Sequence, residues 1–311
     1  MFEDRAHPGG ARHLALIGPT ASGKSRFALE LASSLPAIEI ISLDSMQVYR
    51  GFDIGTAKPT HAEQAAVVHH LIDVVDPHEP WSVRETQRRA TEVLGEIEAR
   101  GGRALFVGGT GLYVQAVVDQ FKIPPQNEEL RAKIEADLET DDGLAAGYQR
   151  LLELDVDAAQ LIEPTNTRRI ARALEVIELT GEPFSQAGGG IKRYSTPALD
   201  VALLGIDTGS ARDQRIDERL DLMLNAGWLE EVRELSNLEW STTAQAAIGY
   251  RELAEVVRGE RPIADAREAI ALRTRQFARR QHRWFRRDPR IIWAEPSKLP
   301  HVRDEILARW S

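Results

Sequence analysis

The stretch GPTASGKS at residues 18–25 constrains the fold of this chain more than any other part of the sequence. It fills every fixed position of the pattern G-x-x-x-x-G-K-[ST], in which a loop between a strand and a helix wraps backbone N–H groups around a pyrophosphate. An apolar run at 14–17 precedes the loop, and apolar residues recur at helical spacing from Phe27 to Leu35. The sequence therefore predicts a strand, a phosphate-binding loop and a helix here.

Two side chains of this loop carry specific expectations. We expect Lys24 to bridge phosphate oxygens as a point charge and the hydroxyl of Ser25 to bind Mg²⁺. The backbone of the other positions is expected to surround the phosphates; these are Gly18, Pro19, Thr20, Ala21, Ser22 and Gly23. The pattern does not identify the phosphate compound or the reaction.

Further short apolar runs predict the rest of the sheet. They lie at 38–43, 71–75, 104–107, 201–206 and 291–293, and helical patterns long enough for crossovers separate them. Strands alternating with helices favour a parallel sheet covered by helices. The predicted fold class is therefore α/β, with a sheet like that of the P-loop NTPases.

The middle of the chain has a different pattern. From residue 122 to residue 197 the strand signals vanish, and helical periodicities remain at 130–138, 144–154 and 167–179. Prolines 124 and 125 and glycines 188–190 mark its two edges. We therefore expect a helical insertion domain at 122–197 within an α/β core formed by 1–121 and 198–311.

Charge is distributed unevenly along the chain. The formal net charge is −9, which disfavours nucleic acid as a partner unless positive charge is gathered locally. Between Arg267 and Arg290 nine arginines stand against two acidic residues. At helical spacing Arg275, Arg279 and Arg283 share one face with Arg286, and this face is expected to bind a phosphate backbone. A solvated surface is the alternative.

The composition excludes several classes of protein. The chain has no cysteine, which excludes disulfides, thiolate metal sites and cysteine nucleophiles. It contains no run of 18 apolar residues, and its first residues lack the plan of a signal peptide. We expect a cytoplasmic protein that has no contact with membranes and that acts as a monomer.

Two loops at the same edge of the predicted sheet supply candidate catalytic groups. Asp44 follows the second apolar run, and three interpretations compete: a helix N-cap, a water-mediated Mg²⁺ ligand, or a general base facing the phosphate loop. Thr110 stands among three glycines after the fourth run and is a candidate ligand contact. Because the fourth run ends without an acidic residue, nucleotide hydrolysis is not expected unless Asp44 serves it.

Seven stretches of the chain together resemble the tRNA dimethylallyltransferases, bacterial enzymes that prenylate an adenine next to the anticodon. Two are far more diagnostic than the phosphate loop: DSMQVYRGFDIGTAKP at 44–59 and VGGTGLYVQA at 107–116. The others are GPTASGKS and the stretches at 69–77, 168–176, 247–253 and 274–285. The resemblance spans nearly the whole chain.

This resemblance implies a reaction and a donor. The loop would hold the diphosphate of dimethylallyl diphosphate with Mg²⁺, helped by Arg215 and Arg219. Asp44 would be the general base that takes a proton from the exocyclic amine of adenine, with Lys24 and Thr110 also in the catalytic site.

The resemblance also implies where the anticodon stem-loop of tRNA binds. The helical insertion would grip the loop, although Arg168 stands where the family commonly has Gln. The implied tRNA-contacting residues are Asp44, Ser45, Met46, Gln47, Thr110, Arg131, Arg168, Arg169, Ile170, Ala171 and Arg172.

Two other functions remain open from the residues alone. A small-molecule or nucleotide kinase would use Lys24 to cradle ATP and Asp44 to activate an acceptor hydroxyl. A non-catalytic RNA-binding module would keep the phosphate loop only as a relict. The arginine face disfavours the first alternative, and the intact Lys24, Ser25 and Asp44 disfavour the second.

Overall fold

The computed structural model describes residues 10–35, 37–187 and 194–310, so the glycines at 188–190 lie outside the described residues. The chain divides into two compact units, one formed by 1–120 with 194–311 and the other by 121–193. Each unit has its own hydrophobic core. Residues 194–197, expected in the insertion, belong to the first unit.

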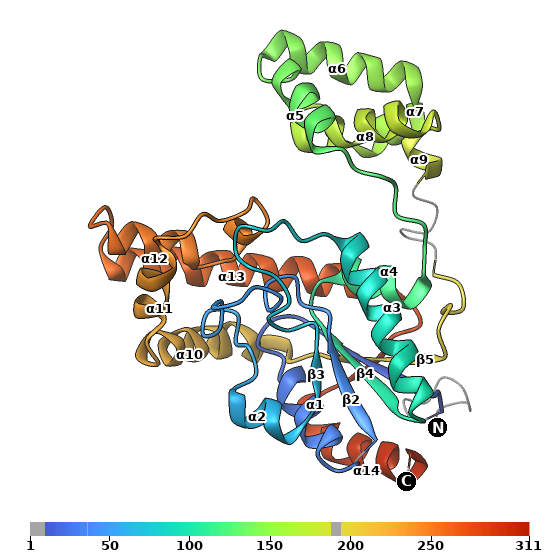
Figure 1. Ribbon diagram of the computed structural model, residues 1–311, viewed down its shortest axis with the longest axis vertical. Helices are drawn as coiled ribbons and strands as arrows, with labels where there is room; N and C mark the ends of the chain where they lie inside the picture. Colours follow the sequence, from blue (N-terminus) through green and yellow to red (C-terminus); the bar gives the residue numbers. More distant parts are fainter. Residues whose placement is uncertain (1–9, 36, 188–193, 311) are drawn as a thin grey trace. The chain divides into compact units, whose positions relative to one another are not determined.

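The first unit is built on one six-stranded parallel sheet in the order β3-β2-β4-β1-β5-β6 (Figure 1). The strands are β1 His13–Ile17, β2 Ile38–Ser42, β3 His69–His70, β4 Arg103–Gly108, β5 Val201–Ile206 and β6 Ile292–Ala294. Its central strands are nearly continuous apolar runs, because a parallel sheet is buried on both faces. The predicted α/β fold class is confirmed.

One predicted strand was misplaced. The run at 71–75 is not a strand, and β3 precedes it at His69–His70. Leu71 and Asp73 have φ angles of 61° and 55°, which a strand does not accommodate. The Asp73 carboxylate instead accepts a hydrogen bond from the buried ammonium of Lys58 at 2.5 Å. The segment therefore leaves the regular ladder after His70, and its backbone bonds instead to residues 47–50.

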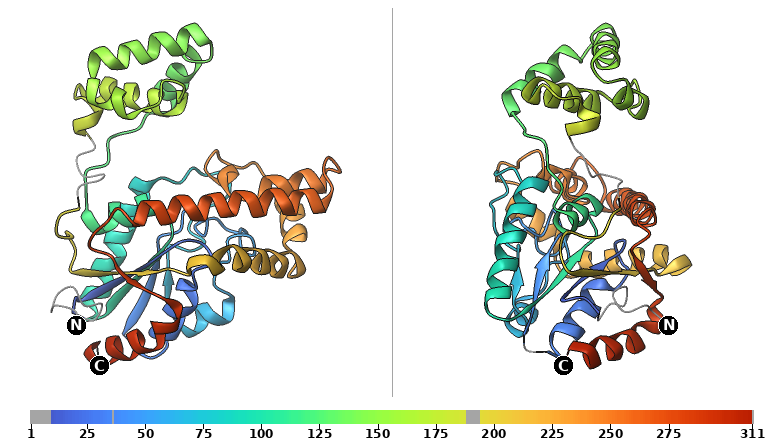
Figure 2. Two further views of the ribbon diagram at one scale, coloured as in Figure 1. Left: turned by 180° about the vertical axis from the view of Figure 1, so that it is seen from behind. Right: turned by 90° about the vertical axis from the view of Figure 1, so that its right-hand side faces the viewer.

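Helices cover both faces of the sheet (Figure 2). Leu14 and Leu16 of β1 face a core shared with α1 and α14, whereas Ala15 and Ile17 face one shared with α3, α4 and the end of α13. The helices of this unit are α1 Lys24–Ala32, α2 His61–Ala66, α3 Val83–Ala99, α4 Gly111–Asp119, α10 Arg212–Asn225, α11 Trp228–Leu235, α12 Tyr250–Val257, α13 Ile263–Phe285 and α14 Leu299–Trp310.

A third core of this unit packs α10 to α13 against the segment that follows β2. Its centre is aromatic: Phe52 stacks on Tyr250 at a centroid distance of 4.2 Å, and Trp228 meets Tyr250 edge-on at 5.7 Å. Gly249 lies against Trp228 so closely that a Cβ there would come within 2.2 Å of the indole ring. These helices are thereby fixed beyond the carboxyl ends of the strands.

The second unit is entirely helical in its described part. Its helices are α5 Glu128–Asp137, α6 Asp141–Leu154, α7 Val156–Leu161, α8 Thr167–Thr180 and α9 Phe184–Ala187. The buried carboxylate of Glu175 accepts hydrogen bonds from the Asn127 N–H and from the guanidinium groups of Arg131 and Arg172. No helix among the residues described in either unit is long and apolar enough to cross a membrane.

Replacing Gly249 by Ala tests the aromatic core. The new Cβ would clash with Trp228, and alanine disfavours the φ of +98° found here, so we expect a loss of about 2–3 kcal/mol in the free energy of unfolding. Gly95→Ala on α3 is the matched control. A Cβ there meets no atom within 4 Å, and alanine favours a helix by about 0.5–1 kcal/mol.

Both variants would be measured by urea unfolding against the unmodified protein. We expect the urea concentration at the midpoint to be highest for Gly95→Ala, intermediate for the unmodified protein and lowest for Gly249→Ala. A Gly249→Ala midpoint equal to that of the unmodified protein would contradict the packing described for Trp228.

Candidate active site

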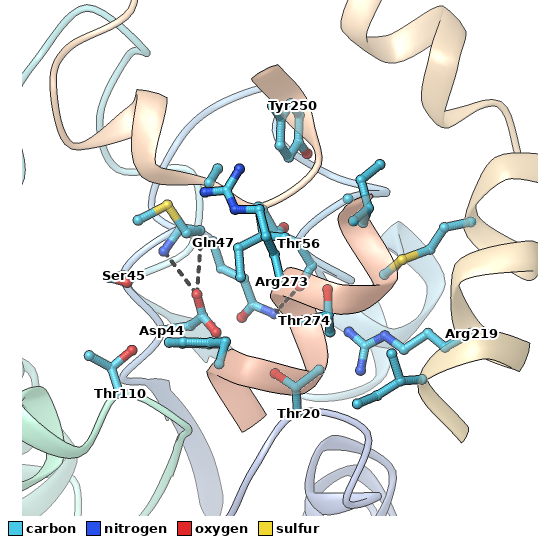
Figure 3. A pocket seen from close by; sticks show the side chains of 18 of the residues that line it. Thr20, Asp44, Ser45, Gln47, Thr56, Thr110, Arg219, Tyr250, Arg273 and Thr274 are labelled. Atoms are coloured by element: carbon cyan, nitrogen blue, oxygen red, sulfur yellow. Dashed lines mark hydrogen bonds between the residues drawn. The ribbon is translucent and has the colours of Figure 1, made fainter. Parts of the chain in front are cut away.

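A cavity of about 420 Å³ lies in the first unit at the carboxyl edge of the sheet (Figure 3). The loops after β1, β2 and β4 meet there, and α10 and α13 form walls. Its polar lining includes Thr20, Lys24, Ser25, Asp44, Ser45, Gln47, Thr56, Thr110, Arg219, Tyr250, Arg273 and Thr274, and Met46 lies beside them. The structure thus brings the phosphate loop together with both predicted catalytic loops.

The phosphate loop adopts the geometry that its pattern requires. Gly18 has a φ of 154°, and a Cβ there would lie 2.7 Å from the carbonyl oxygen of Ile206, so only glycine fits. Lys24 and Ser25 begin α1, whose first N–H groups have no partner within the helix. The hydroxyl of Ser22 is buried without a hydrogen-bond partner in the part of the chain described. The loop therefore has donors available for an anion.

Two half-buried cations border the loop. Burial lowers the pKa of Lys24 to about 8, with Arg219 acting in the same direction and Asp44 opposing it. Burial likewise lowers the pKa of Arg219, again opposed by Asp44. Neither cation makes an ion pair with any described residue. An anionic ligand bound here would supply the negative charge that the described side chains do not provide to these two cations.

The two arginines expected at the diphosphate are placed differently. Arg219 lines the cavity, whereas Arg215, one turn earlier on α10, is exposed and is not part of the lining. Of the two arginines, only Arg219 is therefore in a position to contact a ligand in the cavity.

Asp44 is held by one of its two carboxylate oxygens. Oδ1 accepts hydrogen bonds from the backbone N–H groups of Met46 at 2.8 Å and Gln47 at 3.4 Å. The residues that follow form bends and a turn, so the helix-cap interpretation of Asp44 is wrong and the side chain instead closes a turn. Oδ2 receives no hydrogen bond from the described residues. One oxygen orients the carboxylate while the other is left for a ligand.

Gln47 connects Asp44 to the segment at 53–57, which also borders the cavity. Its side-chain oxygen accepts from the Ser42 hydroxyl at 2.9 Å, and its amide donates to the carbonyl group of Ala57 at 3.1 Å. The amide also donates to the carbonyl group of Thr56 at 3.2 Å (Figure 3). All these contacts are internal. Gln47 therefore shapes the site that it also lines.

Glu231 on α11 fixes the segment at 53–57, and the local sequence does not predict this role. Its carboxylate accepts hydrogen bonds from the N–H groups of Asp53 at 3.1 Å, Ile54 at 2.7 Å and Gly55 at 3.4 Å. It also accepts from the hydroxyl of Tyr250 at 2.6 Å. Glutamate is ordinary on an amphipathic helix, so no local pattern could have identified it.

Thr110 and Gln281 complete the site. Thr110 is the N-cap of α4, yet its side chain makes no capping hydrogen bond and lines the cavity. Gln281 of α13 is buried, and its Oε1 accepts from the N–H of Thr20 at 2.9 Å. A Cβ on Gly109 would lie 2.6 Å from the Gln281 amide nitrogen, so this glycine serves close packing. Like Glu231, Gln281 has no signal in the local sequence.

The side chains at the cavity could supply part of a coordination sphere for Mg²⁺. Ser25 and Asp44 offer a hydroxyl and a carboxylate, and oxygen ligands suit Mg²⁺. No cluster of three or more His, Asp or Glu side chains that could hold a metal occurs in the described ranges. These residues suit an ion that takes most of its ligands from a bound diphosphate and water.

The arginine face expected on α13 is not free. Arg275 pairs with Asp217 at 2.5 Å, and Arg279 pairs with Asp213 at 3.3 Å. Arg286 pairs with Asp207, the residue after β5, at 2.8 Å. The expectation of an unrelieved positive face is therefore wrong for these three arginines, because acidic residues on and before α10 neutralise them. Of the predicted face only Arg283 is exposed without an ion pair in the described chain.

The residues expected to contact tRNA from the second unit fall into three groups. Ile170 and Ala171 are 0% exposed and pack in the core of this unit, so their side chains cannot contact an RNA and this expectation is corrected. Arg131 and Arg172 pair with Glu175 and hold the unit together. Arg168 and Arg169 are exposed at the start of α8.

Sequence comparisons identify the relatives of the chain. A family model described as IPP transferase matches residues 47–288, and another described as isopentenyl transferase matches residues 12–73. A tRNA dimethylallyltransferase of Salinispora tropica is 44% identical over 295 residues, covering 94% of this chain and 91% of the relative. One of Streptomyces griseus is 42% identical over 298 residues, covering 93% and 94%.

Solved structures agree with these relatives. The tRNA isopentenylpyrophosphate transferase of Bacillus halodurans matches with a TM-score of 0.68 at 35% identity, covering 95% of each chain. A eukaryotic dimethylallyltransferase acting on tRNA matches with a TM-score of 0.74 at 26% identity, covering 91% of this chain and 73% of that one. The chain belongs to the tRNA dimethylallyltransferase family of prenyltransferases.

Proposed function

We propose that this protein transfers the dimethylallyl group of dimethylallyl diphosphate to the exocyclic amine of the adenine next to the anticodon of tRNA. One observation carries the proposal: a single cavity joins two half-buried cations, which make no ion pair with the described residues, to a carboxylate that has one oxygen free of hydrogen bonds from those residues. The relatives named above support it.

The phosphate loop would bind the donor through its diphosphate. Lys24, Arg219 and the first N–H groups of α1 would stabilise the negative charge that develops on the leaving diphosphate. Ser25 would hold Mg²⁺, which when bound neutralises part of the diphosphate charge.

Asp44 would act on the acceptor. Because Met46 holds Oδ1, Oδ2 has a defined direction from which to accept a proton. The new bond forms between the adenine nitrogen and the allylic carbon. The bond from this carbon to the diphosphate oxygen breaks with its electron pair, and the proton of the amine goes to Asp44.

The apolar part of the lining favours a prenyl donor over ATP. Ile216 and Leu220 of α10, Ile270 of α13 and Ile248 face the cavity together with Trp228. A prenyl chain has no polar group to satisfy there, whereas a ribose would lose hydrogen bonds to water. We expect ATP to act at most as a weak competitor that is not turned over.

The direct test is mass analysis of tRNA nucleosides after incubation with the purified protein, dimethylallyl diphosphate and Mg²⁺. We expect prenylated adenosine and an equal amount of released diphosphate. Tight ATP binding with tRNA-stimulated hydrolysis and no prenylated adenosine would overturn the proposal in favour of a kinase-like activity.

Asp44→Asn separates catalysis from binding. An amide oxygen can still accept from the Met46 N–H, so the turn is kept while the basic oxygen is lost. We expect the rate of prenyl transfer in single turnovers to fall by about 10² to 10⁴, with the affinities for donor and tRNA nearly unchanged. Asp44→Ala, which loses the turn as well, is the comparison. Near-normal turnover of Asp44→Asn would contradict the role of Asp44 as the general base and would show that it only stabilises the turn.

The depressed pKa of Lys24 predicts how donor binding depends on pH. Only the ammonium form attracts a diphosphate, and the free protein loses it as pH rises through about 8. We expect the affinity for dimethylallyl diphosphate above this pH to fall by up to about tenfold per pH unit, because binding then takes up one proton. Calorimetric titration between pH 7 and pH 10 would measure it.

Variants at Lys24 provide the controls for this titration. Lys24→Ala is expected to abolish donor binding at every pH. Lys24→Arg keeps a charge that does not titrate in this range, so its weaker binding should depend little on pH. The same steep fall in Lys24→Arg as in the unmodified protein would assign the titration to another group.

A further inference from the structure

We propose that Glu231 of α11 is a positioning residue of the reaction, which orients the proposed base Asp44 through a chain of hydrogen bonds across the segment at 53–57. The inference rests on the proposed function, since it assumes that Asp44 takes a proton from the acceptor. Glu231 does not line the cavity, so it acts on the site only through other residues.

The first link of this chain is a carboxylate bound by consecutive backbone N–H groups. Oε2 of Glu231 accepts from the N–H groups of Asp53 at 3.1 Å and Ile54 at 2.7 Å. Oε1 accepts from the N–H of Gly55 at 3.4 Å and from the hydroxyl of Tyr250 at 2.6 Å. Successive N–H groups that point to one side form a concave site for an anion. The protein supplies this anion from its own side chain.

The second link is the turn that these N–H groups begin. The N–H of Ala57 donates to the carbonyl oxygen of Ile54 at 2.9 Å, and the hydroxyl of Thr56 donates to that of Phe52 at 2.6 Å. Ala57 has a φ of 49°, a left-handed conformation that alanine keeps only where its surroundings hold it. The contacts of Glu231 with the start of the turn supply part of this support.

The third link is the side chain of Gln47. Its amide has two hydrogens, and the carbonyl groups of Thr56 and Ala57 accept both, at 3.2 and 3.1 Å. The backbone N–H of Gln47 donates to Oδ1 of Asp44 at 3.4 Å. A displacement of the turn at 53–57 therefore moves Gln47 and changes the direction of the Asp44 carboxylate.

The chain of contacts ends at the group on whose direction the reaction depends. Oδ2 of Asp44 must lie within hydrogen-bond reach of the amine from which it takes a proton. A misplacement of about 1 Å lowers the rate of such a step by up to about 10²-fold. Loss of the Glu231 carboxylate should therefore slow the chemical step and leave the binding of the donor at the phosphate loop intact.

Glu231→Gln tests the first link with little change of shape. One of the two terminal atoms becomes an NH₂ group, which cannot accept from the backbone N–H groups that face it. We expect the single-turnover rate of prenyl transfer, at saturating donor and tRNA, to fall about 10- to 100-fold. The affinity for dimethylallyl diphosphate, measured by calorimetric titration, should stay within about twofold.

Glu230→Gln is the matched control. It makes the same change of net charge on the same helix, but Glu230 is exposed and pairs with Arg233 at 3.6 Å on the surface. Its rate should stay within about twofold of the unmodified rate, because exposed pairs of this kind contribute little. An equal loss of rate in both variants would assign the effect to charge alone and would overturn the proposal.

A double-mutant cycle separates positioning from a general structural role. Asp44→Asn has no basic oxygen to orient, so Glu231→Gln added to it should lower the remaining rate by less than about twofold. A merely structural role would lower the rate by the same factor in both backgrounds. Equal factors, or no loss from Glu231→Gln alone, would overturn the proposal.

Tyr250→Phe repeats the cycle with the carboxylate kept. It removes one donor from Glu231, and the ring that stacks on Phe52 remains. We expect a loss of about 2- to 5-fold in the rate, again only where Asp44 is present. If Glu231→Gln binds no donor, this cycle decides: a loss that is equal in both backgrounds, or none, would overturn the proposal.

The unmodified protein separates this inference from the proposed function. Prenylation of tRNA together with equal factors in the cycle would refute only the positioning role of Glu231. No prenylated adenosine from the unmodified protein would refute the function on which the inference rests.

Discussion

The hydrogen bond between Gln281 and the phosphate loop is the contact on which the geometry of the cavity depends. It joins the N–H of Thr20, at the carboxyl edge of the sheet, to a buried side chain on α13. Because α13 is a single helix of 23 residues, fixing it at Gln281 also places Arg273, Thr274 and Phe277 along the wall. Residue 109 must be glycine because the side chain of Gln281, which is distant in sequence, occupies the space that a Cβ would need.

The ion pairs between α10 and α13 extend this constraint to the second wall. Asp213 and Asp217 each bind an arginine of α13, and Ile216 and Arg219 of the same helix line the cavity. Most such exposed pairs contribute little to stability individually, but several along one seam fix how two helices face each other. The arginines of α13 that pair with these aspartates therefore fix the two walls of the cavity to each other.

Local patterns predicted the elements, and long-range contacts explain what they missed. The phosphate loop, five of the six strands and the position of Asp44 at the sheet edge follow from periodicity and one motif. The segment at 71–75 was misassigned because Lys58 binds Asp73, a contact that no window of hydrophobicity contains. The arginine face was misread for the same reason, since its neutralising aspartates lie far earlier in the chain. Glu231 and Gln281 act only through such distant contacts.

The diagnostic stretch at 44–59 can now be understood as one hydrogen-bonded unit. Glu231 holds the turn at Asp53 to Gly55, and the carbonyl groups after that turn hold the amide of Gln47. Gln47 in turn follows directly on the turn that Asp44 closes. A carboxylate on α11 thus shapes the surroundings of the carboxylate proposed as base. Glu231 collects four donors, more than a single neutral side chain could accept. The same framework orients Asp44 through Oδ1, and its Oδ2 receives no hydrogen bond from the residues that the structure describes.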